Sequence, residues 1–185
     1  MQVQSFVLRW LPDLKKLLLL SRLRPLTAAF RVELGPEVEI EGRVWMPGTG
    51  RVYLGRGVRL RGRLAPIELR AHDGAEIRLG DGVVVESGAS IEATERVEVG
   101  ARTSIGAFAK IIDNHYHRTV GDRNERPAPV PVTVGEDAVV GPRAILLPGA
   151  RVCARAVVRA GQVLAGRREA EPSLRQQSLA NGGTH

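Results

Sequence analysis

The most regular repeat in this chain is VTVGEDAVVGPRAILLPGARVCARAVVRAGQVL, residues 132–164. Within it an aliphatic residue occupies every sixth position: Val134, Val140, Leu146, Val152, Val158 and Leu164. An amphipathic helix repeats every 3.6 residues and a half-buried strand every two, so neither accounts for a period of six. A solenoid does account for it, because each hexapeptide then contributes one short strand and one turn around a narrow apolar core.

The period continues toward the N-terminus in two shorter runs. They comprise Leu79, Val85, Ile91 and Val97, and then Val99, Ile105 and Ile111. The register steps by two residues inside RVEVG (96–100), and the same pair of aliphatics occurs in RVYLG (51–55) and EIRLG (76–80). We therefore predict an all-β domain over residues 35–165, a solenoid whose successive coils pair as parallel strands.

The composition agrees with many thin layers rather than one large core. Only 4% of the 185 residues are aromatic and 21 are Gly, so the core must consist of Val, Ile, Leu and Ala. The single cysteine, Cys153, excludes an intramolecular disulfide framework and favours a reducing, cytoplasmic location. The net charge is +7, but the basic residues do not alternate with aromatic residues along the sequence. We therefore expect no binding to nucleic acid.

The two ends of the chain differ from the repeats. Residues 1–34 are expected to form an amphipathic helical arm, in which helical spacing relates Val7, Trp10, Leu11, Leu14, Leu17 and Leu18. The arm is basic, and its apolar run is too short to span a bilayer. It either caps the end of the core or rests on the anionic inner face of the cytoplasmic membrane. The tail, residues 166–185, is polar and has no period.

The segment KIIDNHYHRTVGDRNERPAPVP, residues 110–131, interrupts the period. After Ile111 the next sixth position is His117, and the spacing returns only at Val134. Residues 113–131 are therefore predicted to project from the coil as a loop. Long insertions in solenoids gather on one face and often build the binding site, so we expect this loop to carry the function.

Three blocks of sequence carry a resemblance to a known family: VEVGARTSIGAFAKIID (97–113), DNHYH (113–117) and the stretch 132–164. They resemble the hexapeptide-repeat acyltransferases, in particular the sugar O-acetyltransferases of the maltose and galactoside type and their relatives in polysaccharide biosynthesis. The resemblance implies a left-handed parallel β-helix, a homotrimer, and active sites between neighbouring subunits. It also implies transfer of an acetyl group from acetyl-CoA to a hydroxyl of a sugar or glycan precursor, with no metal ion.

Acyl transfer from a thioester to a hydroxyl requires a base, and a neutral imidazole suits this task near pH 7. Relatives in polysaccharide biosynthesis carry D-T-D-F-H where this chain has D-N-H-Y-H. The resemblance therefore assigns His117 as the catalytic base. His115 stands where those relatives have an acid, and it is the second catalytic candidate. Two solvated loop histidines without a catalytic role are the remaining interpretation.

Four residues are candidates for binding the acceptor: Asp113, Asn114, Tyr116 and Glu86. Asp113 would orient the imidazole or bind acceptor hydroxyls, and a turn-forming aspartate is the alternative. Tyr116 matches the aromatic residue of the relatives' motif. Glu86 falls near the place of an acceptor-binding Asn in sugar acetyltransferases, although an exposed glutamate of the coil is the plainer interpretation.

The resemblance also indicates where the donor binds. Four small residues match positions that line the pantetheine arm of CoA in the family: Gly141, Pro142, Ala160 and Gly161. Arg159 and Arg167 are candidates for contacts with the CoA phosphates, since Gly166 replaces the lysine that relatives use. The alternative is a solvated arginine-rich surface, because 24 of the 27 basic residues are Arg.

Two other functions use the same architecture. A non-catalytic scaffold would keep the coils without needing the histidines. A zinc enzyme of the carbonic anhydrase type would need three histidine ligands, of which His115 and His117 could supply two. His72 lies about two coils earlier, and we expect it to be too distant to be the third ligand, so no metal site is predicted.

Overall fold

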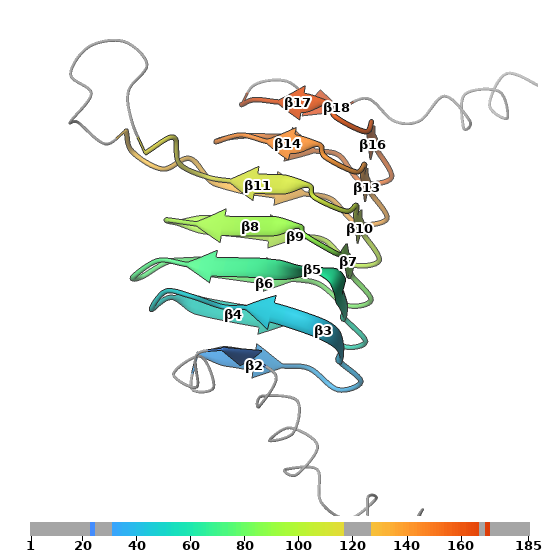
Figure 1. Ribbon diagram of the computed structural model, residues 1–185. Helices are drawn as coiled ribbons and strands as arrows, with labels where there is room; N and C mark the ends of the chain where they lie inside the picture. The colour runs from blue at the N-terminus through green and yellow to red at the C-terminus, as the bar shows by residue number, and fades with distance from the viewer. Residues whose placement is uncertain (1–22, 25–30, 117–126, 167–168, 171–185) are drawn as a thin grey trace, which may run out of the picture.

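The computed structural model describes residues 23–24, 31–116, 127–166 and 169–170, and no helix occurs among them. The strands are β1 (Leu23–Arg24), β2 (Val32–Leu34), β3 (Glu39–Trp45), β4 (Arg51–Leu54), β5 (Arg59–Ala71), β6 (Glu76–Leu79), β7 (Val84–Glu86), β8 (Ser90–Ala93), β9 (Arg96–Val99), β10 (Ser104–Ile105), β11 (Lys110–Ile112), β12 (Val132–Val134), β13 (Val139–Val140), β14 (Ile145–Leu146), β15 (Arg151–Val152), β16 (Val157–Val158), β17 (Val163–Leu164) and β18 (Glu169–Ala170). Their pairings are parallel, and Figure 1 shows the resulting coils stacked from β2 at one end to β17 at the other.

The coils have three faces. Seven strands form one sheet, which we call the third face: β2, β4, β6, β9, β12, β15 and β18. The other sheet bends at the long strand β5, because residues 59–61 pair with β7 whereas residues 68–71 pair with β8. Its two halves are the first face, with β7, β10, β13 and β16, and the second face, with β8, β11, β14 and β17 (Figure 1). The described part of the chain is therefore an all-β parallel β-helix.

The strand register confirms the hexapeptide period. Val139 pairs with Val157, 18 positions later, which equals three hexapeptides per coil. One coil earlier Ser104 pairs with Val139, 35 positions later, because residues 113–131 are inserted between β11 and β12. Ser104 in turn lies 20 positions after its partner Val84, since β9 carries two buried valines in RVEVG rather than one.

Each aliphatic residue of the predicted period is buried. The six in residues 132–164 are at most 4% exposed, and those of the two upstream runs are at most 2% exposed. On the second face the strand register stacks them in the order Ile91, Ile111, Leu146 and Leu164. Burial of one such side chain contributes about 1.5–3 kcal/mol, so many thin aliphatic layers replace the aromatic core of an ordinary globule.

Most turns of the coil follow a common geometry. The third residue after the buried aliphatic has a positive φ, and it is either a glycine or one of Glu37, Arg102, Phe108, Asp137, Arg143 and Arg155. The third residue after Ile111 is Asn114, which does not have a positive φ. The positive φ of 58° occurs two residues later, at Tyr116. The chain therefore departs from the coil's turn geometry at the first residues of the loop.

The ends of the predicted domain are described only in part. The helical arm expected for residues 1–34 lies mostly outside the described residues, and the two described pieces of it form strands β1 and β2. Since residues 32–34 pair with β4, the coil begins before the expected boundary at residue 35. In the tail, β18 pairs with β15. No helix of the described part could cross a membrane. The left-handed sense of the coil stays a prediction.

Candidate functional site

The loop of residues 113–131 leaves the coil where the second face meets the third face, and we call this the loop edge. In Figure 1 the loop edge is the left side of the stacked coils, where β11 ends. Two earlier coils contribute turns to the same edge, since His72 follows β5 and Thr94 follows β8. The side chains at the loop edge therefore come from three successive coils.

Asp113 begins the loop base, residues 113–116, and its side chain is fully buried. Its carboxylate accepts hydrogen bonds from three backbone N–H groups of the adjacent turn: those of Thr94 at 2.7 Å, Glu95 at 2.7 Å and Arg96 at 2.8 Å. Charge-assisted bonds of this kind are roughly twice as strong as neutral ones. The geometry therefore favours the structural interpretation of Asp113 over contact with an acceptor.

Asn114 connects the two ends of the loop. Its Nδ2 donates to the Pro127 carbonyl at 3.0 Å, and its Oδ1 accepts from the Tyr116 N–H. Nearby, the Val130 N–H donates to the Asp113 carbonyl at 2.8 Å. Asn114 is only 4% exposed, so it holds the loop base together and offers little surface to a substrate.

Tyr116 turns back from the loop base toward the coil. Its hydroxyl lies 2.6 Å from Oε1 of Glu92 in β8 and 2.9 Å from Nε2 of His72. The same nitrogen of His72 lies 2.9 Å from Oε1 of Glu92, so the three groups contact one another in a closed triangle. The two rings are tilted by 56°, with their centroids 6.0 Å apart. We call Tyr116, Glu92 and His72 the loop-edge cluster.

The surroundings of the cluster set its charges. Burial raises the pKa of Glu92, but hydrogen bonds from Tyr116 and His72 and the charge of Arg70 outweigh burial, and the pKa is lowered from its ordinary value. Burial and the hydrogen bond to Glu92 raise the pKa of Tyr116 to about 12. At neutral pH the cluster therefore contains a carboxylate that accepts hydrogen bonds and a phenol that donates one.

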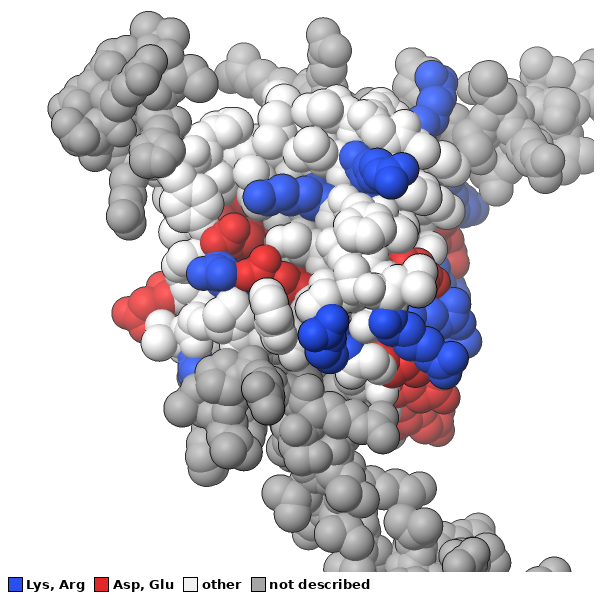
Figure 2. Space-filling model, viewed as in Figure 1, with Lys and Arg blue, Asp and Glu red and all other residues white. Residues whose placement is uncertain are grey.

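A row of charged side chains continues from the cluster along the second face. Nε of Arg70 lies 3.5 Å from Oε1 of Glu92, and Nη2 of Arg70 donates to Glu68 at 2.7 Å. The hydroxyl of Ser90 donates to the other Glu68 oxygen at 3.4 Å. Figure 2 shows acidic and basic side chains interspersed on the face turned to the viewer, rather than gathered in one patch of a single sign.

His115 is described and exposed, whereas His117 lies outside the described residues. His72 contacts Tyr116 because the loop base folds back over the coil edge. The expectation that His72 is too distant to join His115 and His117 as a zinc ligand stays a prediction, since His117 lies outside the described residues. No group of three His, Cys, Asp or Glu side chains suited to a metal ion occurs within the described ranges.

Glu86 lies on the first face, at the end of β7, and not at the loop edge. Its carboxylate is 3.0 Å from Nη1 of Arg61. The neighbouring Ser87 is buried and donates to the Arg61 carbonyl at 2.5 Å. Within one chain, the structure does not bring Glu86 to the loop base.

Five of the predicted donor residues lie together where the first face meets the second, at what we call the opposite edge: Gly141, Pro142, Arg159, Ala160 and Gly161. The Gly161 N–H donates to the Pro142 carbonyl at 2.9 Å, so the two turns are stacked. A Cβ on Gly141 would lie 2.6 Å from the Ala160 nitrogen. Close stacking of coils therefore requires this glycine whether or not a ligand binds. Arg167 lies outside the described residues.

The loop edge and the opposite edge are separated by the width of the second face. The chain crosses this face from Gly141 to Leu147, and at about 3.3 Å per residue that distance is on the order of 20 Å. One chain therefore does not place the loop base beside the predicted donor residues.

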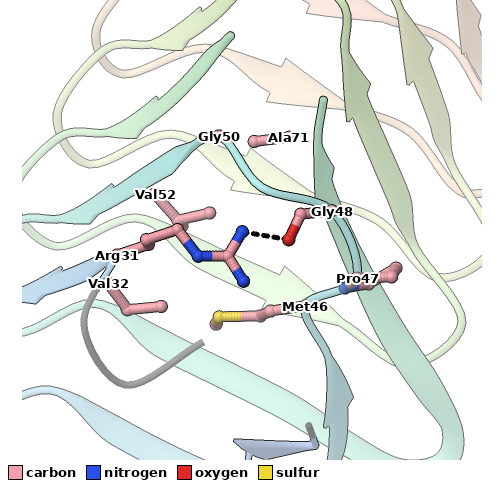
Figure 3. Close-up of a pocket in the computed structure, with 8 residues that line it drawn as sticks. All are labelled: Arg31, Val32, Met46, Pro47, Gly48, Gly50, Val52 and Ala71. Carbon is pink, nitrogen blue, oxygen red and sulfur yellow. Dashed lines mark hydrogen bonds between the residues drawn. The ribbon is translucent and has the colours of Figure 1, made fainter. Parts of the chain in front are cut away.

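Two cavities lie elsewhere on the coil. A space of about 10 Å³, enough for about one water molecule, is lined by Arg31, Val32, Met46, Pro47, Gly48, Gly50, Val52 and Ala71 (Figure 3). At its rim the Arg31 guanidinium donates to the Gly48 carbonyl. A shallow groove of about 560 Å³ crosses the third face, where the Arg78 guanidinium lies 4.0 Å from the centre of the Tyr53 ring. No residue predicted for catalysis or binding lines either space.

Two residues of the loop-edge cluster, His72 and Glu92, are not predicted from the sequence to belong to it. Glu92 follows Ile91, which pairs with Ile111 once the two-residue step in RVEVG is added to three hexapeptides, so its place beside the loop could have been found. His72 carries no such signal, because the thirteen-residue strand β5 before it does not follow the hexapeptide period.

Part of the coil is similar to a known sequence repeat. Residues 131–165 match a family model described as the hexapeptide repeat of succinyl-transferase. No curated protein matches the chain significantly. Among solved structures, a Bacillus cereus protein titled as a candidate acetyltransferase aligns over 80% of this chain and 81% of its own, with 14% identity and a TM-score of 0.45. The match to the hexapeptide repeat of succinyl-transferase thus covers the coils that follow the loop.

Proposed function

We propose that this protein is an acyl-CoA-dependent O-acyltransferase that transfers an acetyl group from acetyl-CoA to a hydroxyl of a sugar or glycan precursor. The hexapeptide repeat after the loop supports acyl transfer in general. The observation that carries the proposal is the rigid attachment of the loop base through the Asp113 carboxylate. It anchors to the coil the loop base, which carries His115 and precedes His117 in the sequence.

The reaction needs a base and no protein nucleophile. A histidine takes the proton of the acceptor hydroxyl, the hydroxyl oxygen bonds to the thioester carbonyl carbon, and the carbon–sulfur bond then breaks. The proton passes from the imidazole to the departing CoA thiolate. Backbone N–H groups commonly stabilise the oxyanion that develops in between. His117 is the first candidate for the base, and His115 is the second.

Donor and acceptor would meet between subunits. Because the loop edge and the opposite edge lie a face apart on one chain, a site that joins them requires a second copy. A homotrimer would bring the small residues of one subunit beside the loop base of the next. Gly161, which has open space around it, would border the pantetheine arm, and Arg159 and Arg167 would meet the CoA phosphates. Glu86 would reach the acceptor only in such an assembly.

A transfer assay tests this function. Purified protein is incubated with acetyl-CoA and a panel of sugars, and release of the CoA thiol is followed. We expect thiol release that depends on an acceptor, and a loss of roughly 10²–10⁴-fold in His117→Ala. A larger loss in His115→Ala would assign the base to His115 instead. Failure of acetyl-CoA to bind in calorimetry at millimolar concentration would sink the acyltransferase proposal, and a non-catalytic scaffold would then describe the protein better.

The proposed setting is the cytoplasm, at the inner face of the membrane. The basic residues 1–34 would bind anionic lipid and bring the protein to membrane-linked glycan precursors. Co-sedimentation with anionic vesicles, compared with neutral vesicles, tests this location. Equal sedimentation with both would contradict it.

A further inference from the structure

Tyr116 has a backbone conformation that tyrosine rarely adopts. Its φ is 58°, in the left-handed region that bulky residues avoid. The other non-glycine residues with positive φ in the described ranges stand three places after an aliphatic residue, where the coil turns, whereas Tyr116 stands five places after Ile111. Such a conformation persists only where the surrounding structure fixes it.

Contacts on two earlier coils fix the Tyr116 side chain. Its hydroxyl contacts Glu92, whose side chain is 17% exposed, and His72, whose side chain is 36% exposed. The backbone N–H of Tyr116 is bonded to Asn114 within the loop base. Because the residues belong to three successive coils, the cluster connects the loop base to a surface two coils away.

The geometry also assigns the protons of the cluster. An ionised carboxylate can only accept, so Glu92 accepts from both of its neighbours. The Tyr116 hydroxyl donates to Oε1, and His72 donates to the same oxygen from Nε2. Neutral His72 therefore keeps its proton on Nε2 and leaves Nδ1 as an acceptor. A carboxylate in this place fixes both the orientation and the tautomer of an imidazole.

We propose that Glu92 and His72 are positioning residues that hold Tyr116 and thereby fix the loop base from which the catalytic histidine extends. The docking of Tyr116 follows from the geometry alone, whereas its catalytic consequence rests on the proposed acyltransferase function. Misplacement of a reacting group by about 1 Å can cost about a hundredfold in rate. The cluster contains none of the predicted donor residues, so we expect its loss to lower turnover more than donor binding.

Hydrogen–deuterium exchange of the full-length protein tests the docking without any activity. Tyr116→Phe removes only the hydroxyl, and Glu92→Ala removes the acceptor. We expect the amides of residues 113–116 to exchange about tenfold faster in both variants, because a hydrogen bond to a charged group is lost. The matched control is Tyr53→Phe, whose hydroxyl lies 3.5 Å from Glu76 on the third face, and it leaves these amides unchanged. Equal exchange in wild type and Tyr116→Phe would overturn the proposal.

Kinetics test the catalytic consequence. In Tyr116→Phe we expect kcat to fall about tenfold while KM for acetyl-CoA stays within about twofold. Glu92→Gln should lose less than Glu92→Ala, since its neutral amide oxygen still accepts hydrogen bonds, although weaker ones. Faster exchange with an unchanged kcat would overturn the positioning role. If the wild type transfers no acyl group, the proposed function fails, and the exchange rates alone decide whether Glu92 and His72 hold the loop base.

Discussion

The hydroxyl of Tyr116 lies 2.6 Å from the carboxylate of Glu92, although 24 positions separate the two residues in the sequence. The contact arises because β11 pairs with β8 in a register that sets Ile112 beside Glu92, and the loop base then turns back over the edge. Hydrogen bonds to charged groups contribute about 1.5–3 kcal/mol, more than neutral ones. The bond from Tyr116 to the largely buried carboxylate of Glu92 therefore holds the loop base against the coil.

The alkaline titration of Tyr116 should show this contact directly. Its pKa is raised to about 12 from an ordinary value of 10.0, so the stability that the contact contributes is present below pH 10 and is lost as the pH rises toward 12. Ultraviolet difference titration of tyrosinate should show a step with a midpoint near 12. The step should vanish in Tyr116→Phe and remain in Tyr53→Phe. A Tyr116 step at the ordinary value would contradict the buried contact.

The acid side of the stability curve should depend on Glu92. Burial opposes its ionisation, but the hydrogen bonds from Tyr116 and His72 prevail and lower its pKa. The contribution of Glu92 is therefore present above the ordinary pKa of a carboxyl group, and it is lost as the pH falls through the lowered folded-state value. Glu92→Gln should cost about 1–3 kcal/mol of unfolding free energy at pH 7. Urea unfolding should show this difference shrinking in acid, and a constant difference at all pH values would argue against it.

The fold is largely predictable because the hexapeptide repeat can be recognised within a short stretch of sequence. An aliphatic at every sixth place fixes which side chains face the core, as Val140 and Val158 illustrate with no exposed surface. The coil that contains the long strand β5 is harder to predict from the sequence. The strand β5 runs through thirteen residues and bends across two faces, and its sequence RLRGRLAPIELRA alternates without a period of six.

The site was predictable only where it is contiguous in sequence. Residues 113–116 were identified as part of the motif, but the buried bonds of the Asp113 carboxylate depend on an adjacent turn. The contact of His72 with Tyr116 depends on the loop base folding back across two coils, and no periodicity encodes that path. The second face likewise separates Glu86 from the loop base, and the sequence alone does not say which faces of neighbouring subunits meet.

Asp113→Ala should destabilise the protein more than a surface substitution does. It removes the acceptor of three backbone N–H groups, and the expected loss of unfolding free energy is about 3 kcal/mol. Asp113→Asn keeps one carbonyl oxygen and should lose about half as much. Urea unfolding of both variants measures the losses. A loss in Asp113→Ala below about 1 kcal/mol, the value of one ordinary hydrogen bond, would show that the bonds do not hold the loop base.

Gly141→Ala separates the structural role of this glycine from its proposed role in donor binding. The new Cβ would lie 2.6 Å from the Ala160 nitrogen and 2.8 Å from the Arg159 carbonyl carbon. Backbone atoms of a stacked coil cannot move aside cheaply, so we expect a loss of roughly 1–3 kcal/mol in unfolding free energy. Gly100→Ala is the matched control, because its Cβ would meet the Glu136 nitrogen at 2.5 Å at a different edge of the coil.

The two variants should lose similar stability and differ in their affinity for acetyl-CoA. Calorimetry at a temperature where both remain folded should show weaker binding in Gly141→Ala and unchanged binding in Gly100→Ala. Both substitutions strain the stacking of neighbouring coils in the same way. A difference in affinity for acetyl-CoA would therefore come from the different positions of Gly141 and Gly100 on the coil. Equal affinity in the two variants would leave Gly141 as a stacking residue only, and the donor would then have to bind away from the opposite edge.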